Sequence, residues 1–298
     1  MKIGVVIQLV ELSDLSRALS WNEIKDTVQL SEELGFDSIW VYDHLLYRNK
    51  GKTTGIWESW SMLSAMAAVS KHVELGTLVA CNSFRNPALL AKMAHTLDEI
   101  SGGRLILGLG AGWNQPEYEA FGIPYDHRVS RFEEAVQIIQ PLLKTGQVDF
   151  SGKYYQAKEC EIKPRSPRSE GIPLMISAFG PRMMKIAAQY ADLWNVCYMS
   201  IPRSTEKLTR SFKRACKLVA RDLESIRLTY TIHLAFPDLL GWKKDKKRGS
   251  LSGSAEEIAQ TLKAYEQLGS AHLMFHLSPS TPEAYKRLAN ALKLYKDM

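Results

Sequence analysis

The chain has few cysteines, and none of them forms a recognisable motif with another. Cys81, Cys160, Cys197 and Cys216 lie far apart in the 298-residue sequence. Without a Cys-x-x-Cys pair, the sequence indicates neither a zinc site nor a disulfide framework. We therefore expect reduced thiols and a cytoplasmic location.

Long hydrophobic runs are also missing. The first ten residues combine a lysine with apolar side chains, but Glu11 and Asp14 end the run. This is too short for a signal peptide or a membrane-spanning helix, so we interpret it as a first strand. We expect no membrane partner.

Only a modest excess of one charge sign is present, with a net charge of +6. The densest basic run, residues 243–248, lies between two glycines, and we interpret it as a solvated loop. A predicted basic helix must also pack on the protein, and no aromatic residues alternate with its cations for base stacking. Those cations are Arg210, Lys213, Arg214, Lys217 and Arg221. A nucleic-acid-binding protein is therefore the least favoured of the alternatives, and we expect no nucleic-acid partner.

Strand and helix patterns alternate along the whole chain. The predicted strands cover residues 1–10, 36–41, 73–80, 104–109, 173–177, 193–196, 227–235 and 271–276. A predicted helix follows each strand, opened by signals such as the pair Asn86 and Pro87 or the capping box of Ser254 and Glu257. Eight such pairs predict a (β/α)8 TIM barrel, with one domain over residues 1–298.

Three insertions interrupt the predicted barrel, after strands four and seven and before strand five. An irregular segment after strand four contains Pro116, Gly122 and Pro124, and residues 150–155 predict a turn between two short strands. A doubly wound sheet is our second choice of fold. Its glycine-rich signature is absent after the first strand.

The fourth strand ends in three glycines at alternate positions, Gly108, Gly110 and Gly112. This spacing is not the Gly-x-Gly-x-x-Gly dinucleotide fingerprint. The bare backbone permits the close approach of a flat ligand, or simply the tight packing of a helix or loop. Under the first interpretation, a Gly112→Val substitution blocks ligand entry and leaves the fold intact.

Polar residues follow several strand ends, where a TIM barrel places its chemistry. Asp43 and His44 come just after the second strand, and a histidine beside a carboxylate can exchange a proton near neutral pH. The alternative is that Asp43 caps a turn and His44 is exposed. Metal-binding residue types are also present at these strand ends, namely Asp43, His44, His233 and His276. We interpret His233 and His276 as core or wall residues, and we therefore expect no metal site.

The segment Gly180-Pro181-Arg182 opens a helix after the fifth strand. Free backbone N–H groups and a cation there predict a phosphate site, and a plain proline-started helix is the alternative.

Together, residues 35–44, 76–88, 100–104, 108–114 and 191–195 resemble the bacterial luciferase-like oxidoreductases. Among these proteins, the branch that uses the deazaflavin coenzyme F420 is the most similar. The resemblance implies a TIM barrel that holds its cofactor ring against a bulge after the third strand, with a non-prolyl cis peptide at Leu78–Val79.

The resemblance also implies roles for individual residues. Asp43 and His44 are implied as catalytic residues, with His44 moving a proton. The implied cofactor contacts are Leu78, Val79, Cys81, Ala111, Gly112 and Trp113 near the ring, and Ser177, Ala178, Gly180 and Arg182 near the phosphate and tail. Phe179 and Pro181 depart from the glycine-rich turn that relatives have at this place.

The resulting hypothesis is an F420-dependent oxidoreductase that transfers a hydride to or from a small organic substrate. The alternative enzyme is an FMN-dependent monooxygenase that uses molecular oxygen in the same barrel. In both, the barrel supplies binding, orientation and exclusion of water. The family resemblance further implies a homodimer.

Overall fold

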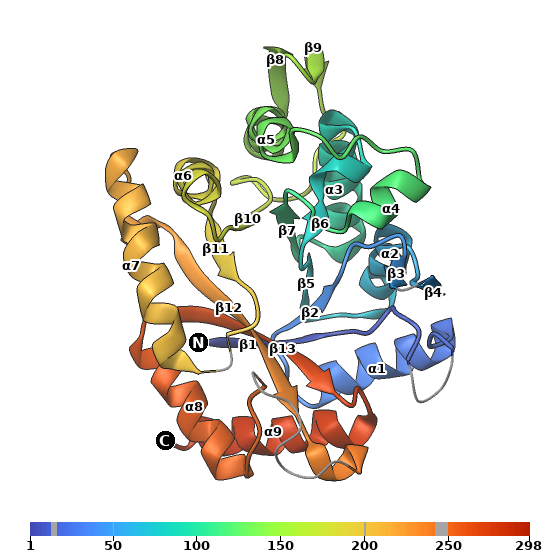
Figure 1. Ribbon diagram of the computed structural model, residues 1–298, viewed down its shortest axis with the longest axis vertical. Helices are drawn as coiled ribbons and strands as arrows, with labels where there is room; N and C mark the ends of the chain where they lie inside the picture. The colour runs from blue at the N-terminus through green and yellow to red at the C-terminus, as the bar shows by residue number, and fades with distance from the viewer. Residues whose placement is uncertain (13–16, 50, 200, 242–249) are drawn as a thin grey trace. The chain divides into compact units, whose positions relative to one another are not determined.

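The computed structural model describes residues 1–12, 17–49, 51–199, 201–241 and 250–298 (Figure 1). The basic run at residues 243–248 lies outside the described residues. None of the helices in the described part of the chain combines the length and apolar character needed to cross a bilayer.

Parallel strands form a closed barrel. The hydrogen-bonded order is β10-β11-β12-β13-β1-β2-β5-β7-β6, and β10 also pairs with β7. Both β5 (Glu74–Thr77) and β6 (Ala80–Cys81) pair with β7 (Leu105–Gly110), so they are two halves of one barrel strand. The described residues thus contain eight barrel strands, which confirms the predicted (β/α)8 fold.

The remaining barrel strands and the helices that follow the strands lie close to their predicted positions. The strands are β1 (Lys2–Val6), β2 (Ser38–Val41), β10 (Leu174–Ser177), β11 (Leu193–Val196), β12 (Arg227–Ala235) and β13 (Ser270–Ser278). The helices are α1 (Trp21–Glu33), α2 (Ser59–Val69), α3 (Pro87–Ser101), α5 (Arg128–Lys144), α6 (Pro181–Tyr190), α7 (Pro202–Leu218), α8 (Ala255–Gln267) and α9 (Pro282–Lys296).

Local signals explain where several helices begin and end. The Asn86 side chain accepts hydrogen bonds from two backbone N–H groups of α3, and Gly102 ends this helix with φ +67°. Ser254 and Glu257 form the predicted capping box at the start of α8. These ends are set by neighbouring residues in the sequence, which is why the sequence predicts them well.

Some inserted elements were not predicted. The antiparallel pair β3 (Tyr47–Asn49) and β4 (Lys52–Thr54) follows β2, and the short helix α4 (Gln115–Ala120) lies within the segment expected to be irregular. The predicted hairpin is present as β8 (Gln147–Ser151) and β9 (Gln156–Glu161).

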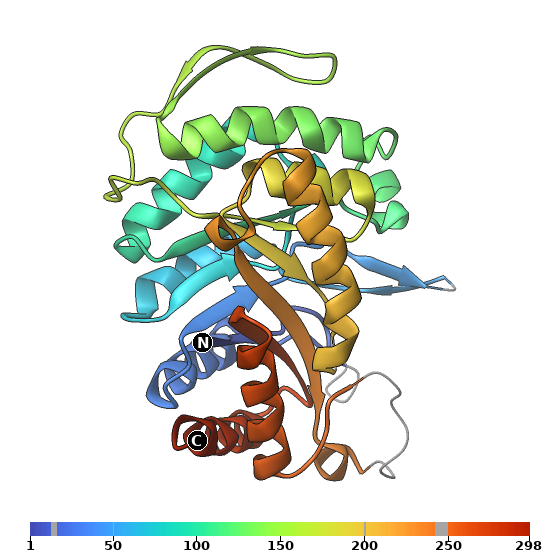
Figure 2. The ribbon, with the colours of Figure 1, turned by 90° about the vertical axis from the view of Figure 1, so that its left-hand side faces the viewer.

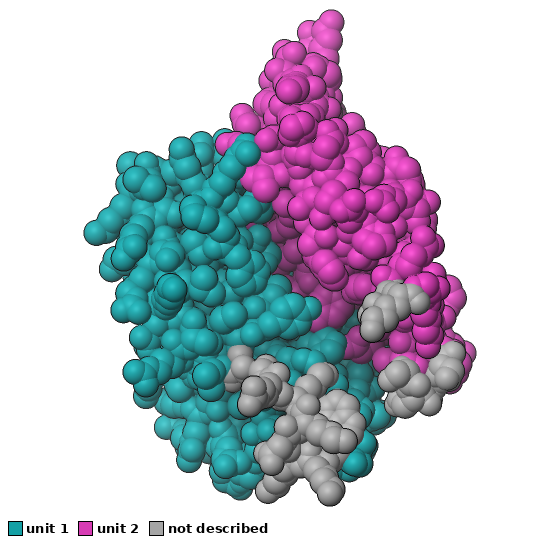
Figure 3. Space-filling model, viewed as in Figure 1, with its two compact units in different colours: residues 1–7, 24–40, 177–298 teal, residues 8–23, 41–176 magenta. Residues whose placement is uncertain are grey.

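The chain divides into two compact units (Figure 3). Unit 1 contains residues 1–7, 24–40 and 177–298, and unit 2 contains residues 8–23 and 41–176. Within unit 1, Phe212 of α7 stacks on the buried Trp194 of β11, with ring centroids 4.2 Å apart. Within unit 2, α3 packs beside α5, as Figure 2 shows.

A buried histidine in unit 1 makes the stability of the fold sensitive to acid. His272 of β13 lies 2.7 Å from the Ser38 hydroxyl, which accepts a hydrogen bond from Trp40 Nε1. With that bond accepted, the hydroxyl donates to Nε2 of the neutral ring. Burial lowers the pKa of His272 to about 3, with a further contribution from Lys2 and Arg227.

We expect this histidine to cost stability as the pH falls. Its pKa in the folded state is below the unfolded value of 6.5, so its contribution is complete above pH 6.5 and is lost towards pH 3. Between pH 7 and 5 the loss is about 2 kcal/mol of unfolding free energy. Urea titrations at both pH values measure it. His272→Gln keeps an acceptor for Ser38 but does not titrate, so an equal loss in this variant contradicts the assignment.

Candidate active site

Asp43, directly after β2, is the centre of a buried hydrogen-bond network in unit 2. Its carboxylate accepts from the Ser59 hydroxyl at 2.8 Å and from the Cys81 backbone N–H at 2.8 Å. It also accepts from both terminal nitrogens of Arg85, at 2.7 and 3.2 Å. The Asp43 side chain is 1% exposed and that of Arg85 is 10% exposed. Asp43 therefore joins the start of α2, the end of β6 and a buried cation.

Arg85 extends this network to a second acid. Its Nη2 donates to Glu58 at 2.6 Å, and the Glu58 carboxylate also accepts from the Trp60 and Ser61 N–H groups at the start of α2. The guanidinium is thus shared between two carboxylates. This arrangement stabilises the position of the loop that carries Asp43 and His44.

His44 is held by a buried glutamate. Its Nδ1 donates to the Glu117 carboxylate, at 2.9 Å from Oε1 and 3.2 Å from Oε2. The same carboxylate accepts the Leu45 backbone N–H at 2.9 Å. Glu117, from α4, is 2% exposed. With Nδ1 engaged, Nε2 is the nitrogen that remains, and it has no hydrogen-bond partner within the described residues.

Two aromatic rings flank the His44 imidazole. Tyr47 of β3 lies with its ring centroid 4.5 Å away, and Trp113 meets His44 edge-on at 5.6 Å. Trp113 is 65% exposed, whereas the His44 side chain is 12% exposed. The rings fix the plane of the imidazole and exclude water from most of it.

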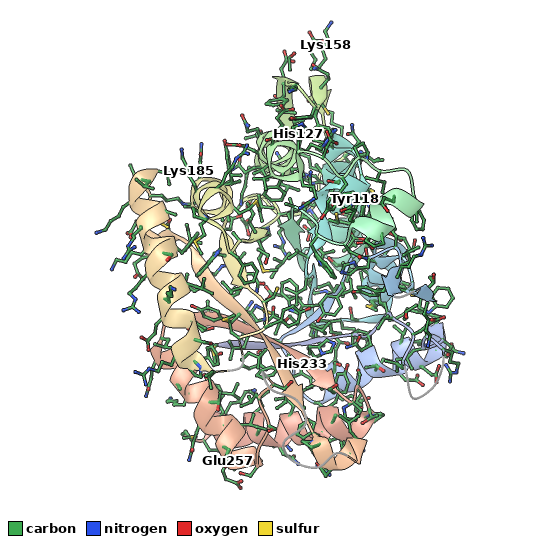
Figure 4. The ribbon with its side chains drawn as sticks, viewed as in Figure 1. Tyr118, His127, Lys158, Lys185, His233 and Glu257 are labelled. Atoms are coloured by element: carbon green, nitrogen blue, oxygen red, sulfur yellow. The ribbon has the colours of Figure 1, made fainter. Side chains whose placement is uncertain are left out.

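The bulge between β5 and β6 has the predicted non-prolyl cis peptide at Leu78–Val79. Leu78 N–H donates to the Val41 carbonyl at 2.8 Å, which attaches the bulge to the end of β2. Cys81 follows the bulge, and its Sγ lies 2.9 Å from the hydroxyl of Tyr118, a residue of α4 labelled in Figure 4. Burial raises the pKa of the Cys81 thiol to about 12, so this thiol is protonated at neutral pH.

Other atoms of the protein fill the space that a Cβ would take at each of the three glycines at the end of β7. A Cβ at Gly108 would meet the Thr77 carbonyl, and one at Gly110 would lie 2.7 Å from the Val79 side chain. At Gly112 it would meet the Tyr118 hydroxyl and, at 2.7 Å, the Cys81 sulfur. The tight-packing interpretation of these glycines is therefore correct, and their Cβ positions are not open to a ligand.

This geometry also corrects the expectation that valine at Gly112 leaves the fold intact. Gly112 has φ +78°, and any side chain there meets Tyr118. We expect even Gly112→Ala to lower the unfolding free energy by about 2–4 kcal/mol, from backbone strain together with overpacking. Gly122, at φ +67° with nothing within 4 Å of its Cβ position, supplies the matched control. Thermal unfolding of both variants tests this, and equal losses exclude the overpacking.

The side chain next to Cys81 is a buried amide that makes no hydrogen bond within the described residues. Asn82, just after Cys81, is 0% exposed, and neither its Nδ2 nor its Oδ1 has a hydrogen-bond partner within the described residues. The phenol of Tyr155, at the end of the hairpin turn, interacts with this amide, but the pair does not reach hydrogen-bond geometry. Burial raises the pKa of this phenol, while Arg131 and the Asn82 amide lower it. An unpaired buried amide costs free energy, which a ligand with a complementary donor and acceptor recovers.

The predicted phosphate-site residues all lie in unit 1. Ala178 is buried, and its carbonyl accepts from Trp194 Nε1 at 3.0 Å. Ser177 Oγ lies 3.8 Å from Cys197 Sγ. Gly180 and Arg182 are exposed at the start of α6, and no side chain caps this helix end. Its backbone N–H groups therefore remain available to an anion.

The polar strand ends do not assemble a metal site in the part of the chain that the structure describes. It contains no group of three or more histidine, cysteine, aspartate or glutamate side chains placed to hold a metal ion. His233 and His276 sit side by side on β12 and β13 in unit 1, with ring centroids 4.5 Å apart. The Asp43 carboxylate is taken by Arg85.

Sequence reasoning missed Glu117, Arg85 and Asn82. Glu117 lies in the segment that we expected to be irregular, and Pro116 beside it was the signal for a helix start. Arg85 and Asn82 lie in the stretch 76–88 that carries the family resemblance, but no role was predicted for either of them. Their partners are distant in sequence, so no local pattern shows their roles.

The sequence matches the luciferase-like monooxygenase family over residues 1–238. An F420-dependent glucose-6-phosphate dehydrogenase of Amycolatopsis mediterranei is 31% identical over 215 residues, covering 69% of this chain and 62% of that protein. The pyrimidine monooxygenase RutA of Bradyrhizobium sp. is 30% identical over 270 residues, covering 82% and 74%. The chain spans about half to two thirds of the length of several such relatives.

A solved structure of an F420-dependent secondary alcohol dehydrogenase, in complex with an F420-acetone adduct, has the same fold. It superposes with a TM-score of 0.80 and covers 99% of this chain and 98% of its own, at 19% sequence identity.

Proposed function

Because this chain belongs to the luciferase-like monooxygenase family, we propose that it is an oxidoreductase that transfers a hydride between coenzyme F420 and a small organic substrate. The observation that carries the proposal is His44, an imidazole whose Nδ1 is held by the buried Glu117 and whose Nε2 is unused. Relatives that are named F420-dependent support the choice of cofactor.

We propose that the unpaired amide of Asn82 pairs with the cofactor ring. The pyrimidine edge of a flavin or deazaflavin ring carries an N–H group beside carbonyl oxygens, which complements one amide donor and one amide acceptor. Asn82 provides both, fully buried and next to Cys81. We propose that the ring also contacts Leu78, Val79, Cys81, Ala111, Gly112 and Trp113. The glycines contribute by admitting the Val79 and Tyr118 side chains that shape this surface, rather than by touching the ring through open Cβ positions.

When bound, the reduced cofactor supplies the hydride, and the protein supplies a proton and the geometry. Glu117 fixes the His44 tautomer with hydrogen on Nδ1 and stabilises the imidazolium, so that Nε2 can accept and return a proton. Tyr47 and Trp113 hold the ring plane while this happens. His44 is thus the proposed acid and base, within reach of a substrate oxygen or carbon.

Asp43 takes a different role from the one that the family resemblance implies. Within the described residues, the Asp43 carboxylate contacts only donors of the protein, and they include the buried guanidinium of Arg85. We propose Asp43 as a positioning residue, which holds the His44 loop and the end of β6 in place. Ser177, Ala178, Gly180 and Arg182 remain the proposed contacts for the cofactor phosphate and tail, with the α6 N–H groups as donors.

An FMN-dependent monooxygenase is the second candidate. The RutA match, which covers 82% of this chain, favours it. Both cofactors present the same pyrimidine edge to Asn82, and the proposed proton role of His44 is common to both reactions. A cytoplasmic homodimer remains our expectation, which light scattering of the purified protein tests for the oligomeric state.

Titration of the purified protein with F420 and with FMN, followed by visible absorbance and fluorescence, tests the proposal. We expect saturable binding of F420 and at least tenfold weaker binding of FMN. The reverse preference favours the monooxygenase, and binding of neither rules out both. Asn82→Ala is expected to lower the affinity for the tighter-binding cofactor by about tenfold, because the cofactor loses a buried hydrogen-bond partner. Asn86→Ala, which removes only the cap of α3, is the control.

A further inference from the structure

The charge of the protein is concentrated on one helix. α7 carries six of the 38 lysines and arginines and one acid, Glu206, in 17 residues. Its net charge is therefore +5, against +6 for the whole chain. All six cations are exposed: Arg203, Lys207, Arg210, Lys213, Arg214 and Lys217. None of these six forms an ion pair within the described residues.

Five of these cations form a stripe along one side of α7. Arg203, Lys207, Arg210, Arg214 and Lys217 are spaced by four, three, four and three residues, which places them on one face over about 21 Å. We name these five residues the α7 cation stripe. Glu206 is the one acid beside the stripe, four residues before Arg210, so the five cations keep a large excess of positive charge on this face.

The opposite face of α7 fixes the stripe in place. Thr205, Phe212, Ala215 and Cys216 are buried, and Phe212 stacks on Trp194. Figure 2 shows α7 in front of β12, with its outer side towards the viewer. The cations are therefore held on a rigid element, and binding a partner does not require the helix to fold or detach.

Large apolar side chains are exposed beside the stripe. Leu218 ends α7 at 78% exposure, one residue after Lys217, and Ile201 precedes the helix at 60% exposure. Aliphatic groups find a favourable environment at the interface of a bilayer, whereas a phosphodiester backbone offers them none. The helix also exposes no aromatic ring for base stacking, which nucleic-acid binding to single strands uses.

In contrast to the expectation of no membrane partner, which rested on the absence of a spanning segment, we propose that the α7 cation stripe binds the surface of an anionic phospholipid bilayer, with Leu218 and Ile201 in contact with the interface. A straight row of cations on a fixed helix matches a flat layer of phosphate headgroups. Each basic residue near such a surface contributes about a fivefold factor to the partition coefficient, and added salt screens this attraction. This is peripheral association through one helix face, and it does not depend on the proposed activity.

Cosedimentation of the whole protein with vesicles tests the proposal. We expect binding to phosphatidylcholine vesicles that contain about 30% phosphatidylglycerol at about 0.05 M salt, and little binding to pure phosphatidylcholine or at about 0.5 M salt. The triple variant R210E/R214E/K217E is expected to lower the partition coefficient by more than about a hundredfold. Circular dichroism melting verifies that this surface variant folds.

A matched variant on α9 separates the stripe from overall charge. K286E/K293E/K296E changes the net charge by the same amount at three exposed lysines of α9. It is expected to bind vesicles within about threefold to fivefold of the unmodified protein, because charge far from the surface is screened. Equal losses in the two triple variants contradict the proposal, as does an absence of vesicle binding at low salt. If the protein binds a DNA duplex more tightly than vesicles, and only the α7 variant loses this binding, the stripe binds nucleic acid instead.

Discussion

Replacing His44 by alanine is expected to lower the turnover of the cofactor-loaded protein by about 10²-fold to 10⁴-fold, the usual contribution of a general acid and base. The imidazole has one nitrogen committed to Glu117 at 2.9 Å and one nitrogen free for proton transfer. Cofactor affinity is expected to change by less than about threefold, because Asn82 and the residues around the bulge remain. A substrate screen with the unmodified protein and reduced cofactor supplies the assay.

Glu117→Gln tests how His44 is held. Glutamine keeps an acceptor for Nδ1 and Leu45 N–H but removes the charge that stabilises the imidazolium, so turnover is expected to fall about 10-fold to 100-fold. Unchanged turnover in His44→Ala contradicts the proton role.

Replacing Asp43 by alanine is expected to lower the unfolding free energy by about 3–5 kcal/mol, as removal of one partner of a buried ion pair does. Arg85 then keeps only the exposed Glu58 as a charge partner, and the Ser59 hydroxyl and Cys81 N–H lose their acceptor. Urea or thermal unfolding measures this loss. Because the loop carries His44, turnover is expected to fall as well.

The double variant Asp43→Ala with Arg85→Met separates the two effects. Removing both charges leaves no uncompensated buried ion, so the double variant is expected to lose less stability than the sum of the single variants. Glu23→Gln, which breaks an exposed pair with Arg17, is the control and is expected to shift the unfolding midpoint much less. Additive losses at Asp43 and Arg85 contradict the assignment of a coupled buried network.

The barrel was predictable from the sequence because its signals are local. The apolar run at residues 104–109, the cap at Asn86 and the capping box at Ser254 each specify one element within a few residues. Eight repeats of the same strand and helix pattern then leave few folds to choose from. The cis peptide at Leu78–Val79 was also predicted correctly, but through the family resemblance rather than through any local pattern.

The site was predictable only in part, because its chemistry depends on contacts between distant residues. His44 and Glu117 are 73 positions apart, and Asp43 and Arg85 are 42 apart. A carboxylate that holds an imidazole and one that caps a surface turn look the same in a sequence. The glycines of this strand show a second limit, because their spacing does not reveal that Val79 and Tyr118 fill the space that their Cβ atoms would take.

The most direct measurement of the central claim is a crystallographic difference map of this protein with its tighter-binding cofactor. We predict density for a planar ring whose pyrimidine edge pairs with the Asn82 amide, next to Cys81. His44 Nδ1 is expected to stay on Glu117, with Nε2 facing the ring or the substrate space beside it. A ring bound elsewhere, or an Asn82 amide that stays unpaired while the cofactor is bound, would contradict the account.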